Sequence, residues 1–144
     1  FTFKEEKSHQ LLVSTVTGIV PYVSFIRNYL ESDRSGHKFY ILAGASYSDE
    51  FIYDKEFIEL SEKYPEFIKF IPSVSRPDEE KNSGWRGSTG RVNNIIEDKI
   101  NELKLPSDDT MIYACGNPDM IEDVKNRVTP LGFGFLEERF WKDD

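Results

Sequence analysis

The residues best suited to chemistry lie in two segments, near the start and near the end of this 144-residue chain. In residues 11–24, a short apolar run stops at Thr15-Val16-Thr17-Gly18, and Pro21 then opens a helical pattern. A strand that leads into a helix N-terminus has this form. The first helical turn leaves backbone N–H groups unpaired and carries partial positive charge, which suits a phosphate. The segment predicts a pyrophosphate seat, although a single Gly here also suits a plain strand-to-helix connection.

The second segment is Cys115-Gly116-Asn117-Pro118, which follows the apolar run of residues 110–115. Gly116 permits a sharp bend, and Asn117 followed by Pro118 is a strong helix start, with an N-cap and a Pro at the first helical position. Cys115 therefore stands at the end of a strand, next to a helix N-terminus. The alternative role for a lone cysteine in this position is that of a small buried hydrophobic residue.

The elements that must position these segments alternate along the chain. Strands are expected over residues 10–14, 38–43, 67–74, 110–115 and 133–136, with a helical apolar stripe between each successive pair. We predict an α/β, Rossmann-like three-layer domain with a five-stranded parallel sheet, order 3-2-1-4-5, and helices on both faces. Ligands of such sheets bind at the carboxyl ends of the strands.

The amino-acid composition excludes several classes of protein. The chain is 38% apolar, which supports a core, and its net charge of −8 argues against a nucleic-acid partner. Its apolar runs are too short for a membrane span, and its single cysteine rules out an internal disulfide and suggests a reducing compartment, the cytoplasm. We expect no metal site, because His9 and His37 have no partners at ligand spacing. Residues 1–9 are interpreted as the end of an interdomain linker and residues 10–144 as one domain.

Taken together, the two segments resemble a known family. Thr17-Gly18-Ile19-Val20-Pro21-Tyr22-Val23-Ser24 and Cys115-Gly116-Asn117-Pro118-Asp119-Met120-Ile121 are similar to the phosphate loop and the Cys-Gly-x-Pro motif of ferredoxin–NADP reductases, bacterial type. The resemblance implies an NAD(P)-binding C-terminal domain that presents nicotinamide to FAD. That FAD is expected in a preceding β-barrel domain, which this chain lacks, so the chain alone is expected to be inactive. Ferredoxin, flavodoxin or an oxygenase component would accept the electrons.

The same resemblance assigns roles to residues. Cys115 would lie beside the nicotinamide, and Phe140 would stack on the flavin ring, which makes these two the catalytic candidates. The resemblance adds cofactor-binding residues in the first loop, in the Cys-Gly-x-Pro motif and near the C-terminus: Thr17, Gly18, Pro21, Gly116, Asn117, Pro118, Met120 and Trp141.

The loops after the second and third expected strands bear on the choice between NADPH and NADH. Arg76 and Arg91 are candidates for the adenosine 2′-phosphate, because Arg binds phosphate oxygens bidentately and keeps its charge. Ser46 stands where bacterial members often carry a further Arg. Tyr47 and Tyr53 are candidates to flank the adenine, although Tyr53 also fits the apolar stripe of its helix. NADPH is favoured, and solvated loop charges are the alternative for each Arg.

Two positions depart from the family pattern. Val16 stands where Gly is usual, and Val20 where Ala is usual. A β-branched residue adopts positive φ only at a cost and keeps a ligand away from the backbone. We therefore expect weaker dinucleotide binding at this loop.

Two other classes of protein remain open at this point. One is a non-catalytic nucleotide-binding or partner-docking α/β module, which the absence of a flavin barrel favours. The other is a flavodoxin-like electron carrier. That class needs a phosphate loop rich in hydroxyl groups after the first strand, and this chain has few.

Overall fold

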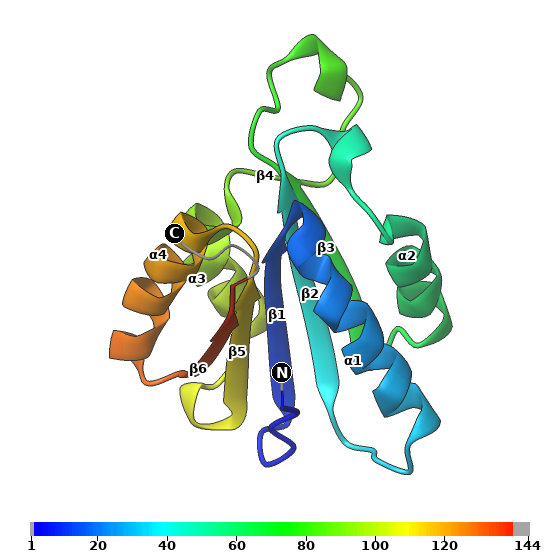
Figure 1. The fold of residues 1–144 in the computed structure, drawn as a ribbon, viewed down its shortest axis with the longest axis vertical. Helices are drawn as coiled ribbons and strands as arrows, with labels where there is room; N and C mark the ends of the chain where they lie inside the picture. Colours follow the sequence, from blue (N-terminus) through cyan, green and yellow to red (C-terminus); the bar gives the residue numbers. More distant parts are fainter. Residues whose placement is uncertain (1, 140–144) are drawn as a thin grey trace.

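The computed structural model describes residues 2–139 and shows a parallel sheet between two layers of helices (Figure 1). The sheet has six strands in the order β4-β3-β2-β1-β5-β6. Their bounds are β1 His9–Thr15, β2 Lys38–Ala45, β3 Ile68–Val74, β4 Ser88–Thr89, β5 Thr110–Cys115 and β6 Gly134–Glu138. Strand β1 lies at the centre, paired in parallel with β2 on one side and β5 on the other.

The helices divide between the two faces of the sheet. Four α-helices are described: α1 Val20–Glu31, α2 Asp54–Lys63, α3 Val92–Leu103 and α4 Pro118–Val128. Short 3-10 turns also occur: η1 Val16–Ile19, η2 Ser48–Glu50, η3 Glu80–Asn82, η4 Ser107–Asp109 and η5 Thr129–Leu131. Helices α1 and α2 cover one face, and α3 and α4 cover the other, because each pair supplies a separate buried cluster.

The predicted class is confirmed, but the predicted number of strands is too low. The expected order 3-2-1-4-5 corresponds to β3-β2-β1-β5-β6, and β4 adds a sixth strand next to β3. Strand β4 has only two residues, paired as Ser73 with Ser88 and Val74 with Thr89. Two residues are too few to show any hydrophobic period, so the sequence gives no sign of this strand.

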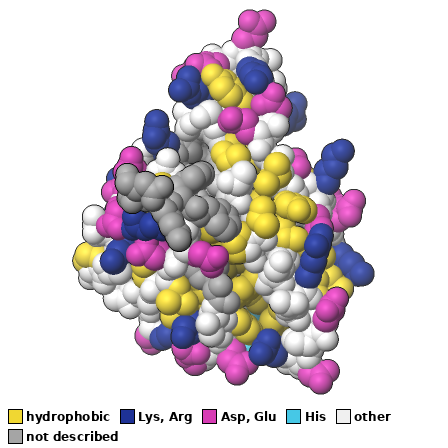
Figure 2. All heavy atoms as spheres, viewed as in Figure 1, with side chains coloured by type: hydrophobic (Ala, Val, Ile, Leu, Met, Phe, Trp, Pro, Cys, Tyr) yellow, Lys and Arg dark blue, Asp and Glu magenta, His cyan; other side chains and the backbone are white. Residues whose placement is uncertain are grey.

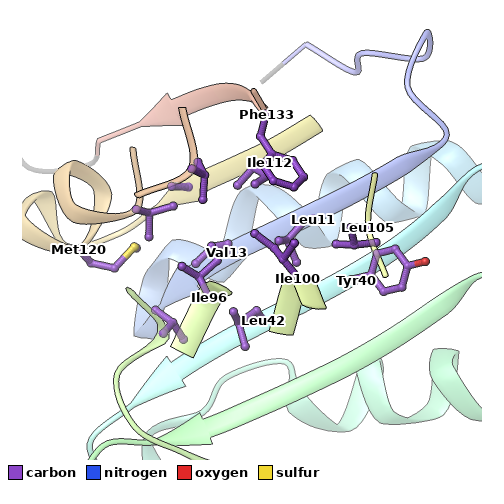
Figure 3. Close-up of a cluster of buried hydrophobic side chains, with 14 of the residues drawn as sticks. Leu11, Val13, Tyr40, Leu42, Ile96, Ile100, Leu105, Ile112, Met120 and Phe133 are labelled. Carbon is purple, nitrogen blue, oxygen red and sulfur yellow. The ribbon is translucent and has the colours of Figure 1, made fainter. Parts of the chain in front are cut away.

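Alternation along β1 explains how the core forms. Leu11 and Val13 pack with α3 and α4, and Leu12 packs with α1. Figure 3 shows the first of these clusters, where Leu11, Val13 and Leu42 from the sheet meet Ile96 from α3. Both faces of β1 are therefore buried, which fixes its register and the position of the loop at its carboxyl end.

Residues 2–8 pack against the amino end of the sheet. The Phe3 ring lies edge-on to Phe25, with 5.4 Å between centroids, and the Lys4 backbone N–H donates to the Tyr113 hydroxyl at 3.1 Å. Gln10 Nε2 donates to the Lys4 carbonyl at 3.0 Å. The chain therefore enters the domain along a fixed path. Among the helices of residues 2–139, none has the length and apolar character needed to cross a membrane.

Candidate functional site

The loops that follow β1 and β5 interlock at the carboxyl edge of the sheet. The Asn117 backbone N–H donates to Thr15 Oγ1 at 2.9 Å. A Cβ on Gly18 would lie 2.2 Å from the Cys115 carbonyl oxygen, and one on Gly116 would lie 2.3 Å from Thr15 Oγ1. Only glycine permits these approaches, because any side chain would collide. The two segments singled out in the sequence therefore meet backbone to backbone.

A cavity of about 520 Å³ opens beside this junction. This volume falls within the range of small-molecule sites, and the position matches the ligand crevice of open α/β sheets. Its walls come from the carboxyl ends of β1, β2 and β3 and from the starts of α3 and α4. The lining residues are Thr15, Val16, Thr17, Gly44, Ala45, Ser46, Ser75, Gly90, Arg91, Val92, Asn93, Asn117, Asp119 and Met120.

The start of η1 offers the donors that a phosphate needs. Neither Thr15, the N-cap of η1, nor Ile19, the N-cap of α1, makes a side-chain capping bond in the described part of the chain. Acidic residues are absent from the first turns of both η1 and α1. Thr17 is exposed at the cavity wall. The N-terminal start of η1 therefore suits the pyrophosphate of a dinucleotide.

The N-terminus of helix α4 also faces this cavity, but unlike the start of η1 it is capped by a side chain. Asn117 Oδ1 accepts hydrogen bonds from the backbone N–H of Asp119 at 2.8 Å and of Met120 at 3.2 Å, so the predicted N-cap forms. Asp119 adds negative charge in the first turn. An anion is therefore directed to η1 rather than to α4.

Val16 adopts the positive φ that its side chain disfavours. Its φ is 37°, and the side chain is 38% exposed at the cavity wall. A β-branched residue in this region stores strain, and such strain concentrates at functional sites. The loop thus keeps the backbone shape that a Gly would adopt freely, and the isopropyl group stands beside the expected path of the phosphates.

The thiol of Cys115 points away from this cavity. It is fully buried in the cluster that includes Tyr22 of α1, and it does not line the cavity. Burial raises the pKa of the Cys115 thiol to about 12, with a further contribution from the negative charge of Glu138. Burial also raises the pKa of Tyr22, whose hydroxyl donates to the Val13 carbonyl at 2.6 Å. In this chain Cys115 meets the cavity junction through its backbone, and Gly18 is likewise buried.

The three residues considered for the adenosine 2′-phosphate are not equivalent. Ser46 and Arg91 line the cavity. Arg76 does not, and its guanidinium lies 3.4 Å from a carboxylate oxygen of Glu79. For Arg91 no ion pair is found among residues 2–139. Arg91 is therefore the better placed cation.

The loop charges near Arg76 are largely compensated. Lys81 lies 3.1 Å from Asp49, and both Lys81 and Arg76 face the Tyr47 ring, at 4.8 and 5.8 Å from its centroid. At the top of the molecule, Figure 2 shows Lys and Arg side chains interspersed with those of Asp and Glu. Pairing of this kind lowers the positive potential available to a bound phosphate.

The other predicted residues differ in where they lie. Asn117 and Met120 line the cavity, and Pro118 begins α4 beside them. Pro21 occupies the first turn of α1, as expected. Phe140 and Trp141 lie outside the described residues. The assignment of Tyr53 to the apolar stripe of α2 is wrong, because its side chain is 43% exposed and its φ of 58° places it outside the helix.

Sequence reasoning missed several residues of the site. Thr15, Ser75 and Asn93 line the cavity, and Asn82 fastens the loops above it. The available signal for Thr15 and Ser75 was their position directly after the first and third expected strands. Asn82 lies in a long polar loop and looks like any other turn residue. Within the described chain, no group of three or more His, Cys, Asp or Glu side chains is arranged to hold a metal ion.

The parallel sheet, the glycine-lined junction and the cavity at the strand ends define a dinucleotide-binding α/β domain. The chain matches the oxidoreductase NAD-binding domain family over residues 12–126 and belongs to that family. The resemblance to ferredoxin–NADP reductases is confirmed. The non-catalytic module is not favoured, because the relatives bear the names of oxidoreductases.

Individual relatives agree with this assignment. The chain is 31% identical over 132 residues to ferredoxin–NADP reductase, root isozyme 1, chloroplastic, of Arabidopsis thaliana, an alignment covering 86% of the chain and 34% of the relative. It is 30% identical over 118 residues to NADH-cytochrome b5 reductase 1 of Dictyostelium discoideum, covering 81% of the chain and 38% of the relative. The chain therefore spans little more than a third of the length of these curated relatives.

Solved structures share the fold. A ferredoxin NADP+ reductase from Neisseria gonorrhoeae with bound FAD and NADP matches with a TM-score of 0.73 and 20% identity, over 94% of this chain and 57% of that one. The cytochrome b5 reductase domain of Ulva prolifera nitrate reductase matches with a TM-score of 0.75 and 19% identity, over 92% and 50%.

Proposed function

We propose that this chain is the NAD(P)H-binding domain of a flavin-dependent oxidoreductase. It binds the dinucleotide at the carboxyl edge of its sheet and presents the nicotinamide to FAD held by a preceding domain of the same protein, to which residues 1–9 link it. The observation that carries the proposal is the interlocked junction of Gly18 with Cys115 and Gly116 beside a cavity of suitable volume. FAD, when bound in its own domain, supplies the redox chemistry.

Different residues are proposed to bind the pyrophosphate, the nicotinamide end and the adenosine end of the dinucleotide. The backbone of η1, with Thr17 and Gly18, receives the pyrophosphate, supported by the uncapped turn. The nicotinamide end lies at the junction of Gly116 and Asn117, and the adenosine end lies over the loops after β2 and β3. Ser46 and Arg91, which line the cavity, receive the 2′-phosphate, and Arg76 is a further candidate outside the cavity lining. This arrangement supports NADPH as the preferred cofactor.

The proposed role of Cys115 is to align the nicotinamide. The buried thiol makes a poor nucleophile, since its raised pKa keeps it protonated at neutral pH. Direct contact between sulfur and nicotinamide requires the sulfur to be uncovered when the nucleotide and the flavin domain are in place. Phe140 and Trp141 keep their proposed places at the flavin and the cofactor.

The electrons leave through a carrier that docks outside this domain. We propose ferredoxin, flavodoxin or an oxygenase component as the acceptor. The net charge of −8 makes this domain a poor dock for an acidic carrier, which favours contact through the flavin domain. The single thiol supports a reducing compartment, and we propose the cytoplasm.

Titration of the isotope-labelled chain with NADP⁺ and with NAD⁺, followed by amide chemical shifts, tests the proposal. Shifts are expected at Thr17, Ser46, Arg91 and Gly116, with tighter binding of NADP⁺. ATP at matched ionic strength controls for simple anion binding. Unchanged amides at all four positions with both dinucleotides would overturn the proposal, and equal affinities would remove the preference for NADPH.

A further inference from the structure

We infer that Asn82 is a positioning residue that holds the two adenosine-side loops in the shape that binds the nucleotide. The inference rests on the proposed function and deepens it. Asn82 lies in η3, outside the cavity, and its side chain is only 2% exposed. A buried amide of this kind is costly unless each of its polar atoms finds a partner.

The Asn82 side chain forms three hydrogen bonds, and each of them is to a backbone atom of one of two loops. Asn82 Oδ1 accepts from the Ser48 N–H at 2.8 Å. Nδ2 donates to the Ser46 carbonyl at 2.9 Å and to the Arg76 carbonyl at 2.8 Å. A single amide therefore joins the loop after β2 to the loop after β3, across 34 and 36 residues of sequence.

The two loops carry the residues proposed for the adenosine end. Ser46 lines the cavity, and Arg76 and Tyr47 stand next to it in space. Further contacts join the same loops: Lys81, adjacent to Asn82, pairs with Asp49, and the ring of Phe51 stacks on Trp85 with centroids 5.7 Å apart. The exposed ion pair contributes little. A backbone hydrogen bond from the Ser75 N–H to the Ala45 carbonyl, at 2.9 Å, joins the two strand ends where these loops begin. The Asn82 amide is the buried side-chain link that holds the Ser46 and Arg76 backbones beyond that point.

The chemistry of the link requires an amide. A carboxylate keeps the acceptor for Ser48 and loses both donors, and it would be buried as a charge. An Ala leaves one N–H and two carbonyl groups without this partner, which costs more than the loss of an exposed hydrogen bond. Either change frees the loops without touching β1, β5 or η1. The expected defect is therefore confined to the adenosine end.

The test compares Asn82→Ala and Asn82→Asp with Asn126→Ala, which alters an exposed residue of α4. The probes are 2′,5′-ADP for the adenosine end and nicotinamide mononucleotide for the other end, with affinities measured by amide shifts. Both Asn82 variants should lose at least tenfold in affinity for 2′,5′-ADP and less than twofold for the mononucleotide. The Ser48 amide should exchange with solvent at least tenfold faster in Asn82→Ala, while the Leu12 amide keeps its protection.

The outcomes separate the two hypotheses. Failure of the unaltered chain to bind 2′,5′-ADP would remove the proposed 2′-phosphate site, and failure to bind either NADP⁺ or NAD⁺ would overturn the proposed function. In both cases the exchange rate of the Ser48 amide still decides whether Asn82 fixes the loops. Wild-type affinity in both Asn82 variants, or equal losses for the two probes, would overturn the positioning role. If Asn82→Ala does not fold, the same comparison in Asn82→Asp decides.

Discussion

Thr15 and Asn117 join the two loops of the site: the Asn117 backbone N–H donates to Thr15 Oγ1 at 2.9 Å. The hydrogen bond spans 102 residues of sequence and closes the junction where β1 and β5 end. The side chain of Asn117 also caps α4. Asn117 therefore links Thr15 to the N-terminus of that helix. The position of the cavity wall depends on this contact.

Thr15→Val should weaken both stability and binding. The substitution keeps the branched shape and removes the acceptor for the Asn117 N–H, which costs about 1 kcal/mol. Chemical denaturation and NADP⁺ titration measure the two effects. Thr15→Ser is the control, because it retains the hydroxyl. Equal behaviour of the Val and Ser variants would show that the hydrogen bond is unimportant.

Gly116→Ala should destabilise the domain more than a change at an open glycine with positive φ. Gly116 has φ 131°, and its Cβ would collide with Thr15 Oγ1 at 2.3 Å. Gly36 has φ 86° with open space around it, so Gly36→Ala reports backbone strain alone. That strain costs about 1–3 kcal/mol, and the collision at Gly116 adds to it. Denaturant midpoints of the two variants measure the difference, and equal losses would contradict the interlocked junction.

Val16→Gly should raise the affinity for the dinucleotide. The change relieves the strain of φ 37° and removes the isopropyl group beside the phosphate path. Relief of about 1–2 kcal/mol is offset by the greater chain entropy of Gly, about 0.5–1 kcal/mol, so stability should change little. Lys104→Gly is the matched control, since it relieves a φ of 55° at the end of α3, outside the cavity. An affinity gain for both variants, or for neither, would contradict the role of Val16.

Cys115 should resist alkylation in the native chain. Burial raises the pKa of the thiol to about 12, so it stays protonated and covered at pH 8. Mass spectrometry after iodoacetamide treatment should show modification only once urea unfolds the protein. Rapid modification of the native chain would contradict the buried position.

The same shift predicts a dependence of stability on pH. A folded pKa above the unfolded one means that the native state holds its proton more tightly than the unfolded state. The contribution to stability is complete below the unfolded pKa, about 8.5, and is lost as the pH rises from there towards about 12. The wild type should therefore lose more stability between pH 8 and 10 than Cys115→Ala, measured by urea denaturation; parallel curves would contradict the shift.

Arg91→Ala should weaken NADP⁺ binding more than NAD⁺ binding. Arg91 lines the cavity and has no carboxylate partner among the described residues, whereas Arg76 is paired with Glu79. Loss of one phosphate contact should cost about 1.5–3 kcal/mol, and Arg76→Ala should cost less. Arg86→Ala, an exposed change outside the cavity, is the control. Equal losses for the two dinucleotides would exclude Arg91 from the 2′-phosphate.

Features that depend on neighbouring residues could be predicted from the amino-acid sequence. The Asn117-Pro118 start of α4 follows from capping chemistry within one turn, and the buried strand at Leu11 to Val13 follows from a continuous apolar run. The alternation of strand and helix then determined the class and the edge of the sheet that carries the site. The glycine motifs gave the family, because their spacing reflects contacts that only backbone can make.

Features that depend on contacts between distant residues became visible only in the folded chain. Strand β4 exists because β3 offers it a free edge, and the side chain of Asn82 finds its three partners in loops far along the chain. The direction of the Cys115 thiol follows from the pleat of β5, which turns the sulfur towards Tyr22 and leaves the backbone at the junction. Local propensity carries no record of such pairings, since their free energy arises only when the sheet brings the partners together.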